Sequence, residues 1–263
     1  GVTDPNLTRA TDTGAVAVGI FATIGDTVEH NIVANFQNTG IYVRNDSLHT
    51  SPTPTIQNNQ ISNCGIGIQA GQLDGATIFG NTITNCTQAG VAVVGEFLDA
   101  NSIYAIRMLN PNPLNAPTVK FIVSQNTFQN VAGPHIALTQ KARSLFDGSY
   151  LPNTRTVPAS DGPNLFQPTP VLSAAMRTPD GGISVQGQTV GTGTLELYSN
   201  GSFLKAVDVP GGIFSVTIPT TQASGVTVIA ATVTVNRQTS EFSPAITVQA
   251  PQGDTQPPTV PVS

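Results

Sequence analysis

The feature that most constrains the fold of this chain is a pattern of apolar residues and asparagines that recurs between residues 28 and 131. Each copy has the form apolar-x-x-Asn-x-apolar-x-Asn-apolar and is followed by a glycine and a second short alternation of apolar residues. Repeats that place equal residues at equal positions are typical of solenoids, which stack them in columns. The copies are Val28–Phe36, Ile56–Cys64, Ile78–Cys86 and Val123–Val131.

The spacing of the copies predicts a parallel β-helix in residues 1–152. Their first asparagines are Asn31, Asn59, Asn81 and Asn126, separated by 28, 22 and 45 residues. Twenty-two residues suit one coil, and 45 suit about two coils or one coil with an excursion. Parallel strands lie about 4.8 Å apart, so like residues in successive coils touch. We expect three interior columns: Val33, Ile61, Ile83 and Phe128; Phe36, Cys64, Cys86 and Val131; Ile41, Ile66, Val91 and Ile136.

The two asparagine columns are interpreted as structural. We expect both to lie where the chain bends, because asparagine tolerates left-handed backbone and stacked amides can bond along a column. The segment Thr13–Ile20 resembles the second half of a coil, so the solenoid is expected to start within a coil. Each end of a solenoid exposes an open sheet edge, which needs a cap or a partner.

A second module is predicted over residues 171–249, where strand-like runs alternate with turns. Asn200-Gly201, between two of the runs, is a strong hairpin signal. Seven short strands in this spacing favour an immunoglobulin-like (Ig-like) β-sandwich. Residues 153–170 are then a linker or a loop packed across the end of the solenoid, and residues 250–263 a proline-rich tail or inter-module linker. The runs are Val171–Arg177, Ile183–Val190, Thr194–Ser199, Phe203–Val209, Ile213–Ile218, Val226–Asn236 and Thr239–Val248.

Three of these segments carry a resemblance to a known group of proteins. Thr194–Gly201, Gly212–Ile218 and Thr239–Pro244 resemble the Ig-like modules that follow parallel β-helix repeats in large bacterial surface proteins. The first half of the chain is similar to the right-handed β-helix repeats of the same proteins. The resemblance implies an all-β protein, secretion and display at the cell surface. It implies no single activity, because the group includes carbohydrate-active enzymes, adhesins and structural proteins.

The composition agrees with an extracellular protein and argues against two kinds of partner. Charged residues make up only 10% of the chain, against about 25% in typical soluble domains. The net charge of −5 argues against nucleic acid, whose binding needs clustered Lys and Arg. No apolar run approaches the roughly 20 residues of a membrane span. Because Gly1 cannot be a natural initiator, we expect a processed chain or a fragment.

No catalytic, cofactor or metal site is predicted. A polysaccharide-cleaving β-helix needs carboxylates, or Lys and Arg, stacked on one outer face. Glu29 aligns with Gln57, Phe79 and Ser124 in the other copies, and no column holds two carboxylates. The one acidic cluster to inspect is Glu96 and Asp99, with Arg107 near them in sequence, and these are interpreted as solvated loop residues.

The histidines and cysteines are interpreted as packing or surface residues. His30, His49 and His135 have no second ligand at metal-binding spacing. Cys64 and Cys86 fall in one interior column, so they are either free buried thiols or a disulfide between neighbouring coils. The parallel direction of their Cβ bonds favours free thiols.

These observations favour a non-catalytic, secreted structural protein that forms part of a surface layer, a stalk or a filament. We expect self-association through the ends of the solenoid or through the tail, because a head-to-tail contact that does not close makes a fibre. One alternative is a carbohydrate-binding adhesin, for which Tyr42, Tyr104 and Phe79 are the candidate stacking residues. Another is a fragment of a polysaccharide lyase or hydrolase whose active coils lie outside this stretch.

Overall fold

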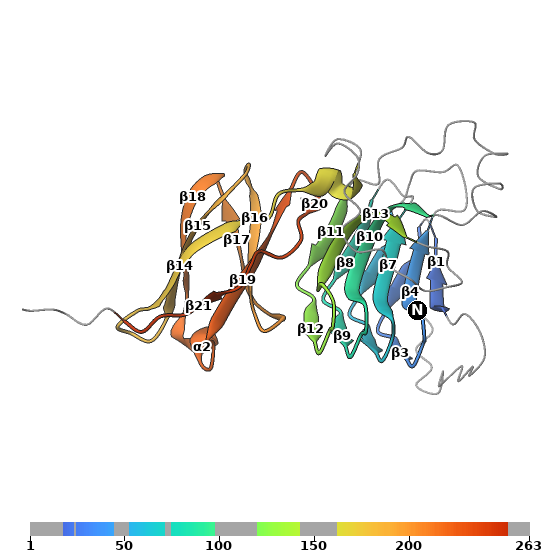
Figure 1. Cartoon of the computed structure of the whole chain (residues 1–263), viewed down its shortest axis with the longest axis horizontal. Coiled ribbons are helices and arrows are strands. Elements are labelled where there is room, and N and C mark those ends of the chain that lie inside the picture. The colour runs from blue at the N-terminus through green and yellow to red at the C-terminus, as the bar shows by residue number, and fades with distance from the viewer. Residues whose placement is uncertain are drawn as a thin grey trace, which may run out of the picture.

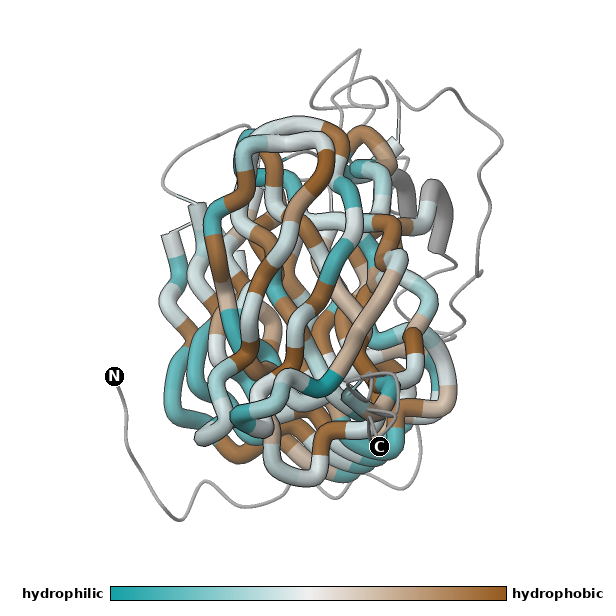
Figure 2. The backbone as a smooth tube through the Cα atoms, turned by 90° about the vertical axis from the view of Figure 1, so that its left-hand side faces the viewer, coloured by the Kyte–Doolittle hydropathy of each residue, from teal (hydrophilic) through white to brown (hydrophobic). Residues whose placement is uncertain are grey.

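In the computed structural model, the chain forms two parts that lie end to end along its longest axis (Figure 1). The first part is a solenoid of parallel strands, and the second is a unit of two antiparallel sheets. Viewed along the long axis, hydrophobic and hydrophilic residues alternate along the strands (Figure 2), as expected where one face of a sheet is buried. The structure describes residues 18–23, 25–44, 53–71, 75–97, 120–142 and 162–251.

The solenoid is built from three parallel sheets, to which each full turn of the chain, here called a rung, contributes one strand apiece. Sheet 1 contains β1 (Val18–Ala22), β4 (Thr39–Arg44), β7 (Ile66–Gly71), β10 (Ala89–Phe97) and β13 (Ile136–Ala142). Sheet 2 contains β2 (Thr27–Glu29), β5 (Thr55–Gln57), β8 (Ala76–Phe79) and β11 (Phe121–Ser124). Sheet 3 contains β3 (Ile32–Ala34), β6 (Gln60–Ser62), β9 (Thr82–Thr84) and β12 (Thr127–Gln129). The predicted parallel solenoid is therefore confirmed.

The register of sheet 3 confirms the first predicted interior column. Val33 pairs with Ile61, Ile61 with Ile83 and Ile83 with Phe128. All of these side chains are buried in one hydrophobic core. The second column is confirmed as well, since Phe36, Cys64 and Cys86 are buried in this core and Val131 packs against it.

The third predicted column is wrong at one position. Ile41 pairs with Ile68, not with Ile66. Ile66 pairs with Thr39 and belongs to a separate cluster with Tyr42, outside the main core. The prediction aligned Gly65 with Gly40, whereas the structure aligns Gly67 with Gly40. A Cβ atom added to Gly40 would lie 2.7 Å from Cγ2 of Ile61, and one added to Gly67 would lie 2.6 Å from Cγ2 of Ile83. In these two rungs a side chain at this position would collide with the interior column, so the strand carries a glycine there.

The first described rung begins with the strand expected near residue 20. Val18 pairs with Thr39 and Ile20 with Ile41, so β1 adds a fifth strand to sheet 1. Residues 13–17 of the predicted segment lie outside the described residues. The described part of the solenoid thus begins within a rung, at the strand of sheet 1.

The C-terminal part, here called the two-sheet unit, consists of two antiparallel sheets around one hydrophobic core. One sheet has the order β14 (Val171–Arg177), β15 (Ile183–Thr189) and β18 (Gly212–Ile218). The other has the order β17 (Ser202–Val209), β16 (Gly193–Ser199), β19 (Val228–Val235) and β20 (Gln238–Thr239), and β21 (Ile246–Thr247) also pairs with β19. A short helix, α2 (Thr220–Ala223), precedes β19. A single turn, η3 (Pro163–Phe166), precedes β14.

Six of the seven predicted strand runs of this unit are confirmed, and the seventh is wrong. The run Thr239–Val248 holds only the end of β20 and the two residues of β21. Between them, the side-chain oxygens of Ser240 and Ser243 accept the main-chain N–H groups of Val233 and Ala231, each at 3.0 Å. These serines replace sheet hydrogen bonds, which lets the intervening residues turn away from the sheet and contact the solenoid.

No helix in the described ranges is long and apolar enough to cross a membrane.

Candidate functional site

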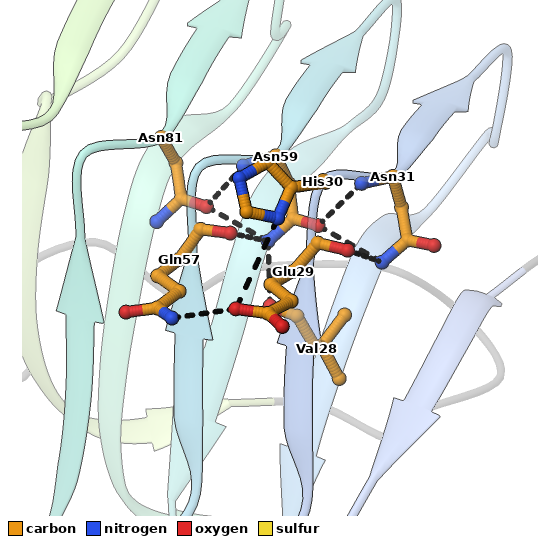
Figure 3. Close-up of polar contacts among 7 residues, drawn as sticks. All are labelled: Val28, Glu29, His30, Asn31, Gln57, Asn59 and Asn81. Atoms are coloured by element: carbon orange, nitrogen blue, oxygen red, sulfur yellow. Dashed lines mark hydrogen bonds and ion pairs between the residues drawn. The ribbon is translucent and has the colours of Figure 1, made fainter. Parts of the chain in front are cut away.

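The corner between sheets 2 and 3 carries a buried ladder of asparagine side chains (Figure 3). Nδ2 of Asn31 donates to Oδ1 of Asn59 at 3.0 Å, and Nδ2 of Asn59 donates to Oδ1 of Asn81 at 2.9 Å. Asn81 continues the ladder to Asn126 at 2.9 Å. Each acceptor oxygen also receives the main-chain N–H of the preceding asparagine. This inner ladder therefore runs in one direction, from each rung to the next, and confirms the predicted bonding along the column.

The left-handed backbone at this corner lies one residue before the inner ladder, which corrects the prediction. Positive φ angles occur at His30, Asn58, Gly80 and Gln125, between 53° and 63°. The ladder asparagines themselves are not left-handed. Their side chains point inward, where Nδ2 of Asn59, for example, also bonds the carbonyls of Val28 and Gln57.

The second asparagine column forms an outer ladder with the opposite polarity. Asn35, Asn63, Asn85 and Asn130 all have positive φ, as predicted. Nδ2 of Asn63 donates back to Oδ1 of Asn35 at 3.1 Å, and Asn85 and Asn130 repeat the contact with the rung before them. These amides are exposed, so each keeps hydrogen-bonding capacity toward solvent.

Beside the inner ladder, Glu29, His30 and Gln57 form a polar cluster on the outer face of the rungs (Figure 3). Oε2 of Glu29 accepts Nε2 of Gln57 at 2.7 Å and lies 3.9 Å from Nδ1 of His30. The register confirms that Glu29, Gln57, Phe79 and Ser124 form one column. General acid–base hydrolysis of glycosides uses two carboxyl groups, and the described part of this column holds one.

The acidic cluster considered from the sequence is not assembled by the described residues. Glu96 lies on β10, with its backbone opposite Lys141 on β13. Asp99 and Arg107 lie outside the described residues, as do Tyr104 and His49. Of the proposed sugar-stacking residues, Tyr42 is fully buried, so its ring cannot serve as an exposed platform.

His135 and the two cysteines have packing roles, whereas His30 is an exposed surface residue beside Glu29. His135 stacks on Phe128, with ring centroids 5.1 Å apart, and burial lowers the pKa of its imidazole. Cys64 and Cys86 are free and buried, which confirms the free-thiol interpretation. Burial raises the pKa of both thiols, to about 12 for Cys86, so neither is a reactive thiolate. Within the described residues, no group of three or more His, Cys, Asp or Glu side chains could hold a metal ion.

The most elaborate polar arrangement lies where the last rung meets the two-sheet unit, at the end of the solenoid that we call the closed end. Here five main-chain N–H groups of the last rung donate to oxygen atoms of the two-sheet unit and of η3, the turn that leads into it, at 2.9–3.0 Å. The pairs are Phe121 with Oδ1 of Asn164, Val123 with Oγ1 of Thr239, Gln125 with Oε2 of Glu196, Leu138 with Oε1 of Glu241, and Phe128 with the carbonyl of Gly201.

Aromatic side chains fill the end of the solenoid core at the same place. Phe166 belongs to the solenoid core, and Phe242 packs against it. The ring of Phe242 meets those of Phe128, His135 and Tyr198 edge-on, with centroids 5.9, 5.1 and 4.7 Å apart. The apolar cross-section that a bare solenoid would expose is thus covered.

Glu196 is one of the two carboxyl groups of this junction, together with Glu241. Its side chain is 2% exposed and accepts hydrogen bonds from Oγ of Ser124, the N–H of Gln125 and the hydroxyl of Tyr198. Burial, together with the neighbouring Glu196 carboxylate, raises the pKa of Tyr198 well above its ordinary value. A buried carboxylate needs such partners, so it fixes how the unit sits on the rung.

The turn η3 holds three residues in left-handed backbone, which costs free energy unless the surroundings enforce it. Asn164, Leu165 and Phe166 have φ of 47°, 50° and 44°. Asn164 is fully buried, and its Nδ2 donates to the carbonyls of Phe121 at 2.8 Å and Thr239 at 3.0 Å. The turn is therefore clamped between the last rung and the two-sheet unit.

The hydrogen bonds of this junction were not predicted from the sequence. The sequence placed Glu196 on a strand, and it placed Asn164 in a linker or in a loop packed across the end of the solenoid. One signal was present, since Glu196 interrupts the apolar run Leu195–Tyr198, where an exposed carboxylate would be out of place.

Comparison with known proteins supports the solenoid. Residues 4–157 match a protein-family model described as a right-handed β-helix region. No curated protein and no solved structure matches the chain.

Proposed function

We propose, on the premise that this chain belongs to the right-handed β-helix family, that it is a non-catalytic structural module of an extracellular or cell-surface protein. In this role it forms a rigid rod segment of a surface layer, a stalk or a filament, which joins its neighbours through its ends or its tail. The family fold by itself does not select this function, because function depends on the site carried by a fold.

The observation that carries the proposal is the sealing of the last rung by the two-sheet unit. Five main-chain N–H groups of the rung are bonded by the unit and its leading turn, and the aromatic contacts of Phe242 join the two cores. Such a junction leaves little freedom between the parts, so the chain transmits position and force along one axis. The described outer face of the rungs, by contrast, gathers no pair of carboxylates.

The strand order of the two-sheet unit supports an Ig-like module. Counted along the chain, the first, second and fifth strands form one sheet, and the fourth, third, sixth and seventh form the other. In constant-type Ig domains the first, second, fifth and fourth strands form one sheet and the third, sixth and seventh form the other, so six of the seven strands lie in the corresponding sheet and the fourth lies in the other one. Ig-like units after a β-helix suit modular surface proteins, and the low charge of the chain agrees with an extracellular location.

Two measurements test the proposal together. Antibodies against the folded chain should label intact cells in an ordered layer or along threads, as seen by electron microscopy. The purified protein should release no products from a panel of acidic and neutral polysaccharides. Cleavage of a polysaccharide that is abolished by Glu29→Gln or Glu96→Gln would show that the chain is an enzyme and would overturn the proposal.

A second candidate function is carbohydrate binding along the outer face of sheet 3. Gln60 pairs with Thr82, and Thr82 with Thr127, so uncharged hydrogen-bonding side chains repeat there about every 4.8 Å. The outer asparagine ladder runs beside this face. A glycan array is the direct test: binding that Thr82→Val weakens favours this function, and no binding to any glycan eliminates it.

A further inference from the structure

The inner ladder ends in complementary groups at the two ends of the solenoid. At the end formed by β1, β2 and β3, here called the open end, Oδ1 of Asn31 receives no hydrogen bond from any described residue. At the closed end, Nδ2 of Asn126 donates to the carbonyls of Ile78 and Ser124, but the described residues offer it no Oδ1 of a following rung. Within the described residues, the open end therefore lacks a donor to Oδ1 of Asn31, and the closed end lacks the Oδ1 that the main-chain N–H and Nδ2 of a ladder asparagine share in the other rungs.

The outer ladder ends in the same complementary way with the polarity reversed. Asn35 accepts from Asn63, and its Nδ2, at the open end, donates to no described residue. Asn130 donates to Asn85 and keeps its Oδ1 at the closed end. The open end of one molecule thus matches the closed end of another at both ladders.

The two-sheet unit stands where a further rung would stand. It takes the N–H groups of Phe121, Val123 and Gln125, which are alternate residues, as the next parallel strand would. It does so with side-chain oxygens that contact backbone, and one of them, the carboxylate of Glu196, also accepts a hydrogen bond from Oγ of Ser124. The next rung of a β-helix would use the same backbone groups.

We propose that the first rung of a second copy of this chain binds the last rung in place of the two-sheet unit. The two-sheet unit is then a cap that competes with the second copy for the last rung. This rests on the proposed assembly through the ends of the rod. While the cap is docked, the closed end cannot accept another molecule. When the cap swings off, β2 and β3 of a second copy stack on β11 and β12 and extend both ladders. Because this contact is head to tail, it repeats without closing and produces rods.

Glu196 and Glu241 are the charged groups that hold the cap on backbone N–H groups, so their removal should release it. The variant Glu196→Ala/Glu241→Ala deletes both acceptors. Hydrogen bonds to charged groups contribute about 1.5–3 kcal/mol each, which predicts at least roughly tenfold faster amide hydrogen exchange at Val123, Gln125 and Leu138. Sedimentation velocity and electron microscopy should then show rods that lengthen with protein concentration.

The milder Glu196→Gln/Glu241→Gln variant keeps side-chain volume and one neutral acceptor per site, and should give intermediate exchange and shorter rods.

Two further variants identify the occupant. Asp208→Asn removes an exposed carboxylate of the same unit, which bonds Oγ1 of Thr194 at 2.8 Å, and should leave exchange and association unchanged. Ile32→Pro, added to the double variant, should abolish the rods. Ile32 is an edge residue whose partner Gln60 bonds the carbonyl of Asn31, so the N–H of Ile32 faces the open side. Proline there blocks the approach of another strand.

Rods that form in the double variant and disappear with Ile32→Pro support the inference. Fast exchange without association overturns it and leaves the structural function standing, as do rods that persist despite Ile32→Pro. Unchanged exchange in the double variant also overturns it, because the two carboxylates would then not hold the cap. Failure of the proposed function would appear elsewhere, as polysaccharide cleavage or as absence from the cell surface.

Discussion

The two ends of the solenoid present the same kind of sheet edge. They differ in whether other described residues bond its main-chain groups and cover its core. At the closed end, polar groups of the two-sheet unit and its leading turn bond the last rung, and Phe166 and Phe242 cover the core. At the open end, Phe21 and Ile32 are 51% and 74% exposed. The comparison teaches that a repeat does not terminate itself, and that a unit of unrelated topology can end it by bonding the backbone of the last rung and packing aromatic side chains against its core.

The largest expected difference between the ends concerns their phenylalanines. Phe242→Ala should lower the free energy of unfolding by about 3 kcal/mol, because it empties the contact between Phe128, His135 and Tyr198. Phe21→Ala at the open end should cost less than about 1 kcal/mol, since that ring is half exposed. Urea unfolding of both variants measures the difference, and equal losses would refute the contrast.

Asparagines at the two ends provide the next test. Asn164→Ala should lower the free energy of unfolding by about 2–3 kcal/mol, because it leaves the N–H and carbonyl of Phe121 unbonded. Residue 164 would also stay in left-handed backbone without the hydrogen bonds that hold it there. Asn31→Ala should cost about 1 kcal/mol, as it ends a ladder that already stops there. Thermal unfolding gives the stabilities, and hydrogen exchange at Phe121 should accelerate in the Asn164 variant alone.

Acid should weaken the closed end. Burial lowers the pKa of His135 in the folded state below its ordinary value of 6.5, so the unfolded or uncapped chain binds a proton more readily. Stability from this group is present above pH 6.5 and is lost as the pH falls from there to the folded-state pKa. His135→Phe should flatten that part of the pH profile. Glu196, Glu241 and Tyr198 lie in the same junction and are present in both the variant and the parent protein, so the comparison isolates the imidazole.

The smallest effect is expected from Ile32→Thr on the exposed edge strand β3. Its free energy of unfolding should stay within about 0.5 kcal/mol of the parent protein, because the side chain is mostly in water. A loss above about 1 kcal/mol in chemical denaturation would mean that the open end is covered in solution, and the contrast between the ends would then be withdrawn.

The solenoid could be predicted because its stabilising contacts are between like side chains one rung apart. Val33, Ile61, Ile83 and Phe128 form a visible column for that reason. The error at Ile66 arose where the repeat contains two glycines, Gly65 and Gly67, which are both crowded, and only the approach to Ile83 shows that Gly67 is the one that lies over the interior column.

The junction could not be predicted in the same way. Asn164, Glu196, Thr239 and Glu241 bond main-chain groups, which every residue carries and which leave no mark in the sequence of the rung. The same contacts explain why the run after Thr239 is not a strand, since Glu241 and Phe242 turn out of the sheet to reach the solenoid. Local strand propensity predicted the unit but not its docking. The boundaries at residues 152, 170 and 249 remain predictions.

The opposite directions of the two asparagine ladders have an electrical consequence. The inner ladder orients its amide groups toward the closed end and the outer ladder toward the open end, so the dipoles of one chain of amides oppose those of the other. Each added rung contributes to both, so the two contributions partly cancel as the number of rungs grows. A rod built from this repeat can therefore lengthen with a smaller electrostatic penalty at its tips than either ladder alone would cause.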